Sequence, residues 1–416
     1  MKKDAKVIIS GAGPVGLITA LKLAKAGVDV LVLEADDAVS DAPRACIYFG
    51  ATIAALDSLG LLEDVEKFAF KSTKFTRHVP EYGYAATLDN EKVDIGPYNY
   101  VLHFGQEKLA GVVLAHLLKI PNAEVRWKTR VTDVAQDPDG VNVTVEGSAG
   151  SETLRADWLV GADGARSTVR QLLRIEFAGH TWPDRFVATN VKCDMGSLGY
   201  SPGNFICDPR DWAIICIIDA DGLWRITYGE DGELSEQLVV QRVRDRLRAF
   251  IPDGTDYELT AARPYSVHQR AATRLREGRV LLAGDAAHAT NPLGGLGLTT
   301  GIWDAMILGD ILVAVIDEAG SDDLLDRYSE ERLRTFWDVT SPAASENKRS
   351  VQETDSDARK ADMEQFKALT ESTEMTAMAL RFSYATIGDP VLKTSPWRKY
   401  LPPRNPRAAD VAAEQA

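Results

Sequence analysis

The stretch that decides the fold is Lys6-Val7-Ile8-Ile9-Ser10, followed at once by Gly11-Ala12-Gly13-Pro14-Val15-Gly16. The first five residues are mostly β-branched and apolar, which is typical of a strand buried on both faces. Leucines and alanines at helical spacing come next, and Gly27 ends that helix. Residues 28–34 then form a second apolar run. The order strand, glycine turn, helix, strand predicts a nucleotide-binding α/β unit.

Each of the three glycines in the turn has its own role. Gly11 allows the tight turn, Gly13 lets the backbone approach a pyrophosphate, and Gly16 lets the helix pack on the strand. The free N–H groups at the start of the helix would face the phosphates. Glu34 closes the second strand, where an acid accepts a ribose hydroxyl. These residues predict a dinucleotide site but do not separate FAD from NAD.

The middle of the chain has a different pattern. Several short strands recur between residues 185 and 265, and Asp221-Gly222 predicts a hairpin between two of them. A predicted helix at 237–250 interrupts this region, and apolar strand and helix patterns return after residue 279. We therefore expect an α/β domain built from both ends of the chain, with a sheet-rich insertion between them. The expected segments are 1–70, 97–180 and 270–345 for the α/β domain, 71–96 and 181–269 for the insertion, and 346–416 for a C-terminal helical part.

The composition limits the class of partner. The chain has 416 residues, enough for two or three structural units, and a formal net charge of −14. An excess of acid disfavours nucleic acid or an anionic membrane surface, because binding to phosphates needs a basic face. The cysteines are far apart and form no Cys-x-x-Cys pair; they are Cys46, Cys193, Cys207 and Cys216. We expect reduced thiols in a cytoplasmic protein, and no metal site.

Two apolar runs have some features of a targeting or membrane segment. The run from Val7 to Ala24 follows two lysines, as in a signal peptide, but it contains glycines, Pro14 and Lys22 and lacks a convincing cleavage site. The run from Ala305 to Ile316 is too short to span a bilayer and contains Asp310. We therefore expect no membrane span. The charged run 346–359 is expected to be a solvated helix face.

Two further motifs narrow the identity of the cofactor. Gly161-Ala162-Asp163-Gly164-Ala165-Arg166-Ser167 follows one apolar strand, and Gly284-Asp285-Ala286-Ala287-His288 follows another and leads into Asn291-Pro292-Leu293-Gly294-Gly295-Leu296-Gly297. With the first glycine turn, in this order and at these distances, the chain resembles the single-component FAD-dependent aromatic hydroxylases of the para-hydroxybenzoate hydroxylase type. The resemblance covers roughly residues 5–345. It implies an α/β fold with a Rossmann-like FAD-binding domain (GR2-type), an inserted sheet-rich substrate domain and C-terminal helices.

The resemblance also implies which residues bind FAD. Asp285 would contact the ribityl chain, Arg44 would lie near the ribityl and pyrophosphate groups, and Gln106 would contact the flavin. We expect His288 to orient its loop. The helix beginning near Leu298 would point its N–H groups at the pyrimidine edge of the flavin. The family usually has Asn at the position of Thr299, so a side-chain contact there is in doubt. The full expected set is Gly11, Gly13, Pro14, Val15, Gly16, Glu34, Ala35, Arg44, Gln106, Val131, Asp163, Asp285, Gly295, Gly297, Leu298 and Thr299.

The substrate side rests on strand alternation. Trp212, Ile214, Cys216 and Ile218 share one strand face by period two, whereas Trp224, Ile226 and Tyr228 share a face of the next strand, with Arg225 opposite them. Residues considered for a substrate pocket also include His78 and Tyr82. The expected substrate residues are Tyr84, Asn204, Arg225, Tyr228 and Pro292.

Taken together, the residues and the resemblance predict an FAD-dependent monooxygenase that consumes NADH or NADPH and O2 and hydroxylates an aromatic small molecule through a C4a-hydroperoxyflavin. The single glycine fingerprint fits a nicotinamide coenzyme that visits without a domain of its own. The flavin carries the chemistry, so no protein nucleophile is required and no catalytic residue is assigned. Epoxidation, Baeyer–Villiger-type oxygenation, reduction and a non-catalytic flavin-binding role remain alternatives. Subunit number, monomer or homodimer, stays open.

Overall fold

The computed structural model describes residues 4–42, 44–148 and 150–401. The glycine turn joins β1 (Val7–Ser10) to α1 (Pro14–Lys25), as predicted, and β2 (Val30–Leu33) pairs in parallel with β1. These strands lie in a six-stranded sheet of order β18-β19-β12-β1-β2-β8, in which every pair except β18–β19 is parallel. The remaining strands are β8 (Ala123–Arg126), β12 (Trp158–Gly161), β18 (Arg276–Glu277) and β19 (Val280–Leu282).

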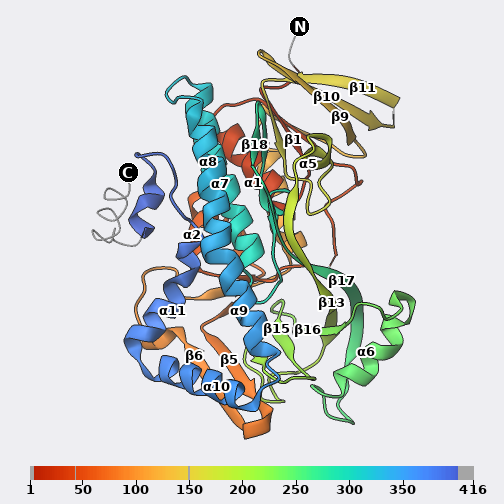
Figure 1. The fold of residues 1–416 in the computed structure, drawn as a ribbon, viewed down its shortest axis with the longest axis vertical. Coiled ribbons are helices and arrows are strands. Elements are labelled where there is room, and N and C mark those ends of the chain that lie inside the picture. Colours follow the sequence, from red (N-terminus) through yellow and green to blue (C-terminus); the bar gives the residue numbers. More distant parts are fainter. Residues whose placement is uncertain (1–3, 43, 149, 402–416) are drawn as a thin grey trace.

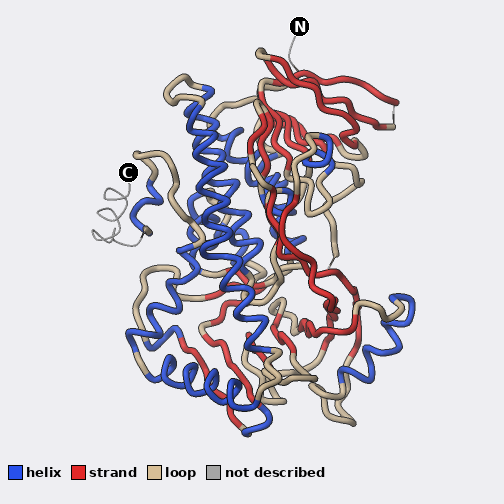
Figure 2. The backbone as a smooth tube through the Cα atoms, viewed as in Figure 1, coloured by secondary structure: helices blue, strands red, loops and turns tan. Residues whose placement is uncertain are grey.

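Helices cover this sheet. α1 packs against both α4 and α7, and their apolar residues form the largest buried cluster with those of the sheet. Figure 2 shows the long helices grouped beside the upper sheet. The helices of this part are α2 (Gly50–Ser58), α3 (Leu62–Glu66), α4 (Gln106–Leu117), α5 (Thr168–Leu172), α7 (Leu296–Ile316) and α8 (Asp323–Thr335).

Two smaller sheets complete the α/β part. One is antiparallel, with order β11-β10-β9, and projects at the top of Figure 1. The other has the order β3-β7-β4 and contacts the insertion, where His103 of β7 bonds the Ile217 carbonyl at 3.1 Å. The strands are β3 (Ile47–Tyr48), β4 (Phe70–Ser72), β7 (Val101–His103), β9 (Arg130–Asp137), β10 (Gly140–Gly147) and β11 (Gly150–Ala156).

An eight-stranded sheet forms the insertion, with order β20-β17-β13-β16-β15-β14-β5-β6. β13 (Phe177–Lys192) and β17 (Glu258–Ala272) are its long members and run side by side from the upper part of the molecule into the lower part (Figure 1). β13 therefore runs across the expected domain boundary at residue 181, and β17 runs across the one at residue 270. The boundaries themselves stay predictions. The others are β5 (Lys74–Val79), β6 (Tyr84–Asp89), β14 (Gly203–Ile206), β15 (Ala213–Ile217), β16 (Leu223–Asp231) and β20 (His288–Ala289).

α6 (Val239–Leu247) covers one face of this sheet, and its Val239, Val243 and Leu247 join the sheet's second buried cluster. The helix predicted at 237–250 is thus shorter and follows the 3-10 turn η3 (Glu236–Leu238). The other short helices are η1 (Pro80–Tyr82), η2 (Asn90–Lys92), η4 (Gly284–Ala286), the π-helical η5 (Phe336–Thr340) and η6 (Pro396–Tyr400).

α7 starts at Leu296, two positions earlier than predicted, and it is long and apolar enough to cross a membrane. It is the one such helix in the described part of the chain. However, 72% of its most apolar window is buried inside the protein. Burial, and not the short length expected from the sequence, therefore identifies it as a core helix.

The C-terminal part is helical, as predicted, with α9 (Ser341–Val351), α10 (Ser356–Glu371) and α11 (Thr373–Ala385). The expectation of a solvated face at 346–359 was wrong for two residues. Lys348 and Arg359 are buried, the first paired with Asp184 at 3.0 Å and the second with Glu81. The reason is that α9 and α10 pack on the insertion sheet, so their basic side chains meet its acidic ones.

Candidate active site

The glycine turn after β1 is tightly packed on one side and open on the other. A Cβ at Gly11, whose φ is +109°, would lie 2.5 Å from the Ala162 carbonyl oxygen, and one at Gly16 would lie 2.0 Å from the Gly11 oxygen. A Cβ at Gly13 would have no described atom within 4 Å. No described side chain caps α1, which begins at Pro14. Free N–H groups therefore face open space, where a pyrophosphate fits.

Glu34 is held at the end of β2 by the same turn. Its carboxylate accepts hydrogen bonds from the amides of Ala12, at 2.7 Å, and Asp36, at 3.0 Å. The Glu34 carbonyl accepts from the amide of Thr129, two residues before Val131. Val131 is buried in β9. The structure thus brings Glu34, Ala35 and Val131 to one end of the site, as an adenosine-binding role requires.

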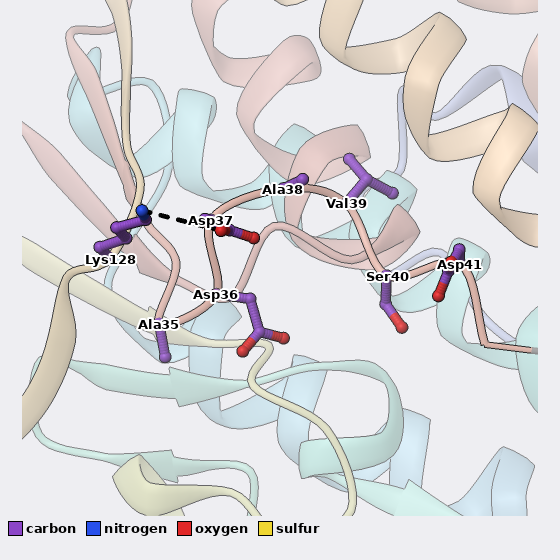
Figure 3. A pocket seen from close by; sticks show the side chains of 8 residues that line it. All are labelled: Ala35, Asp36, Asp37, Ala38, Val39, Ser40, Asp41 and Lys128. Atoms are coloured by element: carbon purple, nitrogen blue, oxygen red, sulfur yellow. Dashed lines mark ion pairs between the residues drawn. The ribbon is translucent and has the colours of Figure 1, made fainter.

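A surface pocket of about 530 Å³ opens beside this end of the site (Figure 3). It is lined by residues 35–41 and Lys128, and Lys128 pairs with Asp37 at 3.7 Å. Three of its residues, Asp36, Asp37 and Asp41, are acidic. Carboxylates accept hydrogen bonds from hydroxyl groups and repel phosphates, so the pocket suits a ribose better than a phosphate.

Asp285 lies on a turn fixed by a buried charge cluster. The Gly284 amide donates to Asp304 Oδ2 at 2.9 Å, and Asp304 also pairs with His288 at 2.9 Å and with Arg332 at 2.7 Å. Burial raises the pKa of Asp304, but the charges of His288 and Arg332 outweigh it and hold that pKa below its usual value. His288 is thus held next to Asp304 of α7, and its expected role in orienting the loop stays a prediction.

Asp285 itself is exposed, although its neighbours Gly284 and Ala286 are buried. The surrounding protein displaces water and raises the pKa of Asp285, while nearby Arg44 and His288 lower it. An accessible carboxylate surrounded by protein mass lies in a recess. This placement fits an acid that accepts a hydrogen bond from a ribityl hydroxyl of FAD.

Asp163 has a different task from the one expected. Its carboxylate accepts hydrogen bonds from the Ser167 hydroxyl and from the amides of Thr168, at 2.7 Å, and Val169, at 3.1 Å. The side chain therefore stabilises the first turn of α5. Only its backbone remains available to a cofactor.

The residues expected around the flavin ring converge from three segments. The backbone N–H of Gln106 donates to the carbonyl of Ala45, the residue next to Arg44, at 3.1 Å. A Cβ at Gly295, whose φ is +65°, would lie 3.1 Å from the Phe49 ring. The loop of Gly295 and Gly297 thus lies beside residues 44–49, which we call the flavin-side segment.

α7 starts directly after Gly295, and no described side chain caps it. Thr299 donates its hydroxyl to the Gly295 carbonyl at 3.0 Å, so its side chain is already engaged. The N–H groups at the start of α7, including that of Leu298, remain for a bound ring. The glycine turns, the recess at Asp285 and this helix start together fit FAD.

One face of the insertion sheet meets this region, and we call it the site face. It carries Asn190 of β13, Arg225 of β16 and Cys216 of β15, which are directly paired across the strands. Arg225 donates to the Asn190 Oδ1 at 3.0 Å and to the Arg44 carbonyl. The site face therefore contacts the flavin-side segment through Arg225.

Apolar and aromatic side chains form the rest of the site face. Phe186 pairs with Tyr265 across β13 and β17, and the Phe186 and Trp212 rings lie 4.7 Å apart. Ile214 and Thr227 pair across β15 and β16. Strand alternation predicted Trp212, Ile214 and Cys216 on one strand face, but it did not indicate Phe186, Tyr265 or Thr227. Alternation from Arg225 could have indicated Thr227; the other two needed the strand register.

Two expected substrate residues were wrong. Tyr228 lies on the opposite face of β16, buried in the cluster under α6 with Trp224 and Ile226. Asn204 is fully buried; its side chain bonds Ser201, the Ile215 carbonyl and His78. Both are structural, because pleating turns them away from the site face.

The expected substrate residues Tyr84 and Pro292 are both half-buried. Tyr84 lies on the edge strand β6, half-buried against the cluster that contains Val79 and Phe186. Pro292 is half-buried before the glycine loop and accepts from the Gly295 amide at 3.0 Å. These positions neither support nor contradict a contact with the substrate, so both residues stay predictions.

Comparison with protein families matches residues 4–343 to a model described as "FAD binding domain". The chain is 45% identical over 365 residues to a para-nitrophenol 4-monooxygenase of a Pseudomonas species, covering 87% of this chain and 91% of the relative. It is 42% identical over 354 residues to a 6-hydroxy-3-succinoylpyridine 3-monooxygenase of Pseudomonas putida, covering 84% and 90%.

Among solved structures, a p-nitrophenol 4-monooxygenase of Pseudomonas putida superposes with a TM-score of 0.90 at 43% identity. The match covers 94% of this chain and 100% of that one. The fold described above is therefore shared over nearly the whole length, including the insertion sheet and the C-terminal helices.

Proposed function

This chain belongs to the FAD-binding class A flavoprotein monooxygenases and is an FAD-dependent hydroxylase of aromatic compounds; within that family we propose that it oxygenates a small hydroxylated six-membered ring. The proposed position is the ring carbon opposite the hydroxyl group, where the ring carries its second substituent. NADH or NADPH is the proposed reductant.

The names of the two relatives support this position. A 4-monooxygenase of para-nitrophenol acts at the carbon opposite the hydroxyl, which carries the nitro group. In 6-hydroxy-3-succinoylpyridine, carbon 3 is likewise opposite the hydroxyl and carries the succinoyl group. A deprotonated ring hydroxyl donates electron density to the opposite carbon, which favours attack there by an electrophilic oxygen.

The observation that carries the proposal is the site face against the flavin-side segment. Phe186, Trp212 and Tyr265 give this face an apolar, aromatic character that suits an aromatic substrate, and Arg225 is a buried cation at the junction. A guanidinium favours a negatively charged ring oxygen over a neutral one. The site therefore suits a small acidic phenol or hydroxypyridine.

The protein's own contribution is binding and positioning. Electrons and activated oxygen for the hydroxylation come from bound FAD. Glu34 and the N-terminus of α1 would hold the adenosine and pyrophosphate half, Asp285 would hold the ribityl chain, and the start of α7 would favour negative charge at the ring edge. The apolar site face excludes water from the reacting atoms.

A basic entrance supports the nicotinamide coenzyme. Burial lowers the pKa of His268, and the nearby charges of Arg270 and Arg166 lower it further. Asp285 lies near the same imidazole and opposes this effect. Arg44 lies near Asp285. These cations would attract a dinucleotide anion despite the net charge of −14.

Substrate-dependent oxidation of NADH and NADPH tests the proposal with three compounds: para-nitrophenol, 6-hydroxy-3-succinoylpyridine and 3-(3-hydroxyphenyl)propionate. We expect product from a ring with a substituent opposite its hydroxyl, seen as nitrite for para-nitrophenol. Product only from the phenylpropionate would contradict the proposed position. If the protein binds FAD but oxidises neither NADH nor NADPH with any of the three substrates, the proposed reaction would be contradicted.

A further inference from the structure

Two of the four cysteines meet where the flavin-side segment contacts the site face. The Cys46 and Cys216 Sγ atoms lie 3.4 Å apart, although 170 residues separate them in sequence. Cys46 precedes β3 on the flavin-side segment, and Cys216 lies on β15. The contact therefore joins the FAD-binding part of the chain to the substrate sheet, and neither the predicted chemistry nor the family comparison gives it a role.

Both ends of the pair are held in place by the backbone. The Cys46 carbonyl accepts from the Phe104 amide at 3.1 Å, and the Ala45 carbonyl accepts from the Gln106 amide at 3.1 Å. Cys216 is paired in register with Gly203 on one side and Arg225 on the other. The space beside Gly203 is filled by the Phe75 and His103 rings, which leaves the Cys216 strand closely packed on that side. The two sulfurs are thus positioned before any reaction.

The surroundings favour a thiolate on one of the two sulfurs. The hydrogen bond with Cys216 lowers the pKa of Cys46 to about 7, against the opposing effect of burial and with help from the Arg225 charge. The same hydrogen bond, together with burial, raises the pKa of Cys216 well above its usual value. A thiolate beside a protonated thiol is the arrangement of an attacking and a resolving cysteine.

We propose that Cys46 and Cys216 form a peroxide-sensitive dithiol that closes to a disulfide between the flavin-side segment and the site face. The oxidant is hydrogen peroxide. The Cys46 thiolate attacks one peroxide oxygen, the O–O bond breaks, and the departing hydroxide takes up a proton to become water. Cys216 then attacks the Cys46 sulfenic acid, the S–O bond breaks, and a second water leaves with the Cys216 proton. Two thiols lose two electrons in total, and peroxide gains them.

The bond would act on the site because of where it lies. A disulfide requires an S–S distance of about 2.0 Å, so the sulfurs must approach each other from 3.4 Å. That movement draws the segment next to Arg44 toward β15 and removes the thiolate beside Arg225. Turnover should fall while the cofactor stays bound, and an external dithiol should restore it. In the cytoplasm expected from the sequence, such a bond would be transient.

The test treats the purified holoenzyme with hydrogen peroxide in the absence of substrate, followed by denaturing alkylation and peptide mapping. We expect free thiols to fall from four to two per chain, with one Cys46–Cys216 linked peptide that dithiothreitol removes. Bound FAD, followed by absorbance, should not change. Turnover should fall with the appearance of the linked peptide and return on reduction.

Two variants sharpen the test. In Cys216→Ser the reaction should stop at a Cys46 sulfenic acid, which dimedone traps, and no linked peptide should form. Cys193→Ser is the matched control, because Cys193 is half-buried next to Asp194 and packs against the cluster under α6, not the one that holds Cys46 and Cys216; it should leave the link unchanged. Four free thiols after treatment, a link involving Cys193 or Cys207, or a Cys46 sulfinic acid without a link in the parent protein would overturn the proposal.

Discussion

Asp285 and Asp163 are two aspartates at the site whose carboxylates have different surroundings. The Asp285 side chain reaches a recess, whereas the Asp163 carboxylate is occupied by α5. The sequence placed both in similar turns after buried strands and assigned both to the cofactor. At the scale of the residue, the hydrogen bonds already made by a side chain decide whether it remains available to a ligand.

Asp285→Ala should give protein largely free of FAD, because the carboxylate that accepts from the ribityl chain is lost. The ratio of flavin to protein absorbance after purification measures this. Asp163→Asn is the control: it should retain FAD and lose about 1 kcal/mol of stability through the weaker start of α5. Full FAD retention by Asp285→Ala would contradict its assignment.

The buried cluster of Asp304, His288 and Arg332 predicts a pH-dependent stability. Asp304→Asn should cost about 3 kcal/mol near neutral pH, because Arg332 is left buried without its counter-charge. Since the folded pKa of Asp304 is depressed, its contribution is present above the usual aspartate pKa of about 4 and is lost as the pH falls through the lower folded value.

Thermal unfolding of the FAD-free parent and Asp304→Asn proteins, measured from pH 7 downward, checks this. The difference between their midpoints should be constant to about pH 4 and narrow below it. A difference that stays constant through more acidic pH would contradict the depressed pKa.

At the scale of the element, a helix start and a strand face decide function. α1 begins without a described side-chain cap, so its first N–H groups remain for the cofactor, and Gly11 and Gly16 are packed against backbone while Gly13 is open. β16 presents Arg225 to the site and Tyr228 to α6. Neighbouring residues of one element thus have different tasks.

Gly13→Ala should fold normally and bind FAD weakly. The φ of −73° at Gly13 suits alanine and its Cβ meets no described atom, so only the space of the pyrophosphate is filled. We expect an unchanged unfolding midpoint for the FAD-free protein and a raised FAD dissociation constant by fluorescence titration. Gly16→Ala is the contrast, because its Cβ would clash with the Gly11 carbonyl and disturb the fold itself. Equal FAD affinity in Gly13→Ala would place the pyrophosphate elsewhere.

Tyr228→Phe should leave kcat/KM unchanged and should not lower stability, because its buried hydroxyl has no hydrogen-bond partner among the described residues. Arg225→Met should instead raise KM for an acidic phenol and reduce turnover. Steady-state kinetics of the two variants measures the contrast. A large loss of activity in Tyr228→Phe would return that residue to the substrate site.

At the scale of the whole molecule, the FAD-binding part and the substrate sheet interleave. β13 and β17 pair with each other along most of their length and pass from one part into the other (Figure 1). Arg225 and the cysteine pair add contacts between the flavin-side segment and the site face. The parts are therefore mechanically joined at the place where cofactor and substrate must meet.

This joining predicts a single cooperative unfolding transition. Calorimetry of the holoenzyme should show one peak, and flavin fluorescence and far-UV circular dichroism should change at the same temperature. Two separate peaks, with FAD released in only one of them, would show that the substrate sheet unfolds independently.

The FAD-binding part can be predicted from the amino-acid sequence, because the motifs that specify it are local. Gly11, Gly13 and Gly16 follow one strand and open one helix, and their tasks depend on neighbours a few residues away. The turn at Asp285 and the helix after Gly295 are local in the same way. Strand alternation also placed Arg225 opposite Tyr228, although it did not say which of the two faces the cofactor.

The substrate side depends on contacts between residues far apart in the sequence. Phe186 and Tyr265 meet through the register of β13 and β17, and Cys46 meets Cys216 across 170 residues. The burial of Lys348 and Arg359 likewise depends on acids of a distant sheet. The physical reason is the distance in sequence between the interacting residues. Turns and helix starts are determined by adjacent residues, whereas the face of a strand that lines a site is determined by the elements that pack on the sheet. For this chain α6 covers one face, whereas the opposite face meets the C-terminal helices at Phe186 and the flavin-side segment at Arg225.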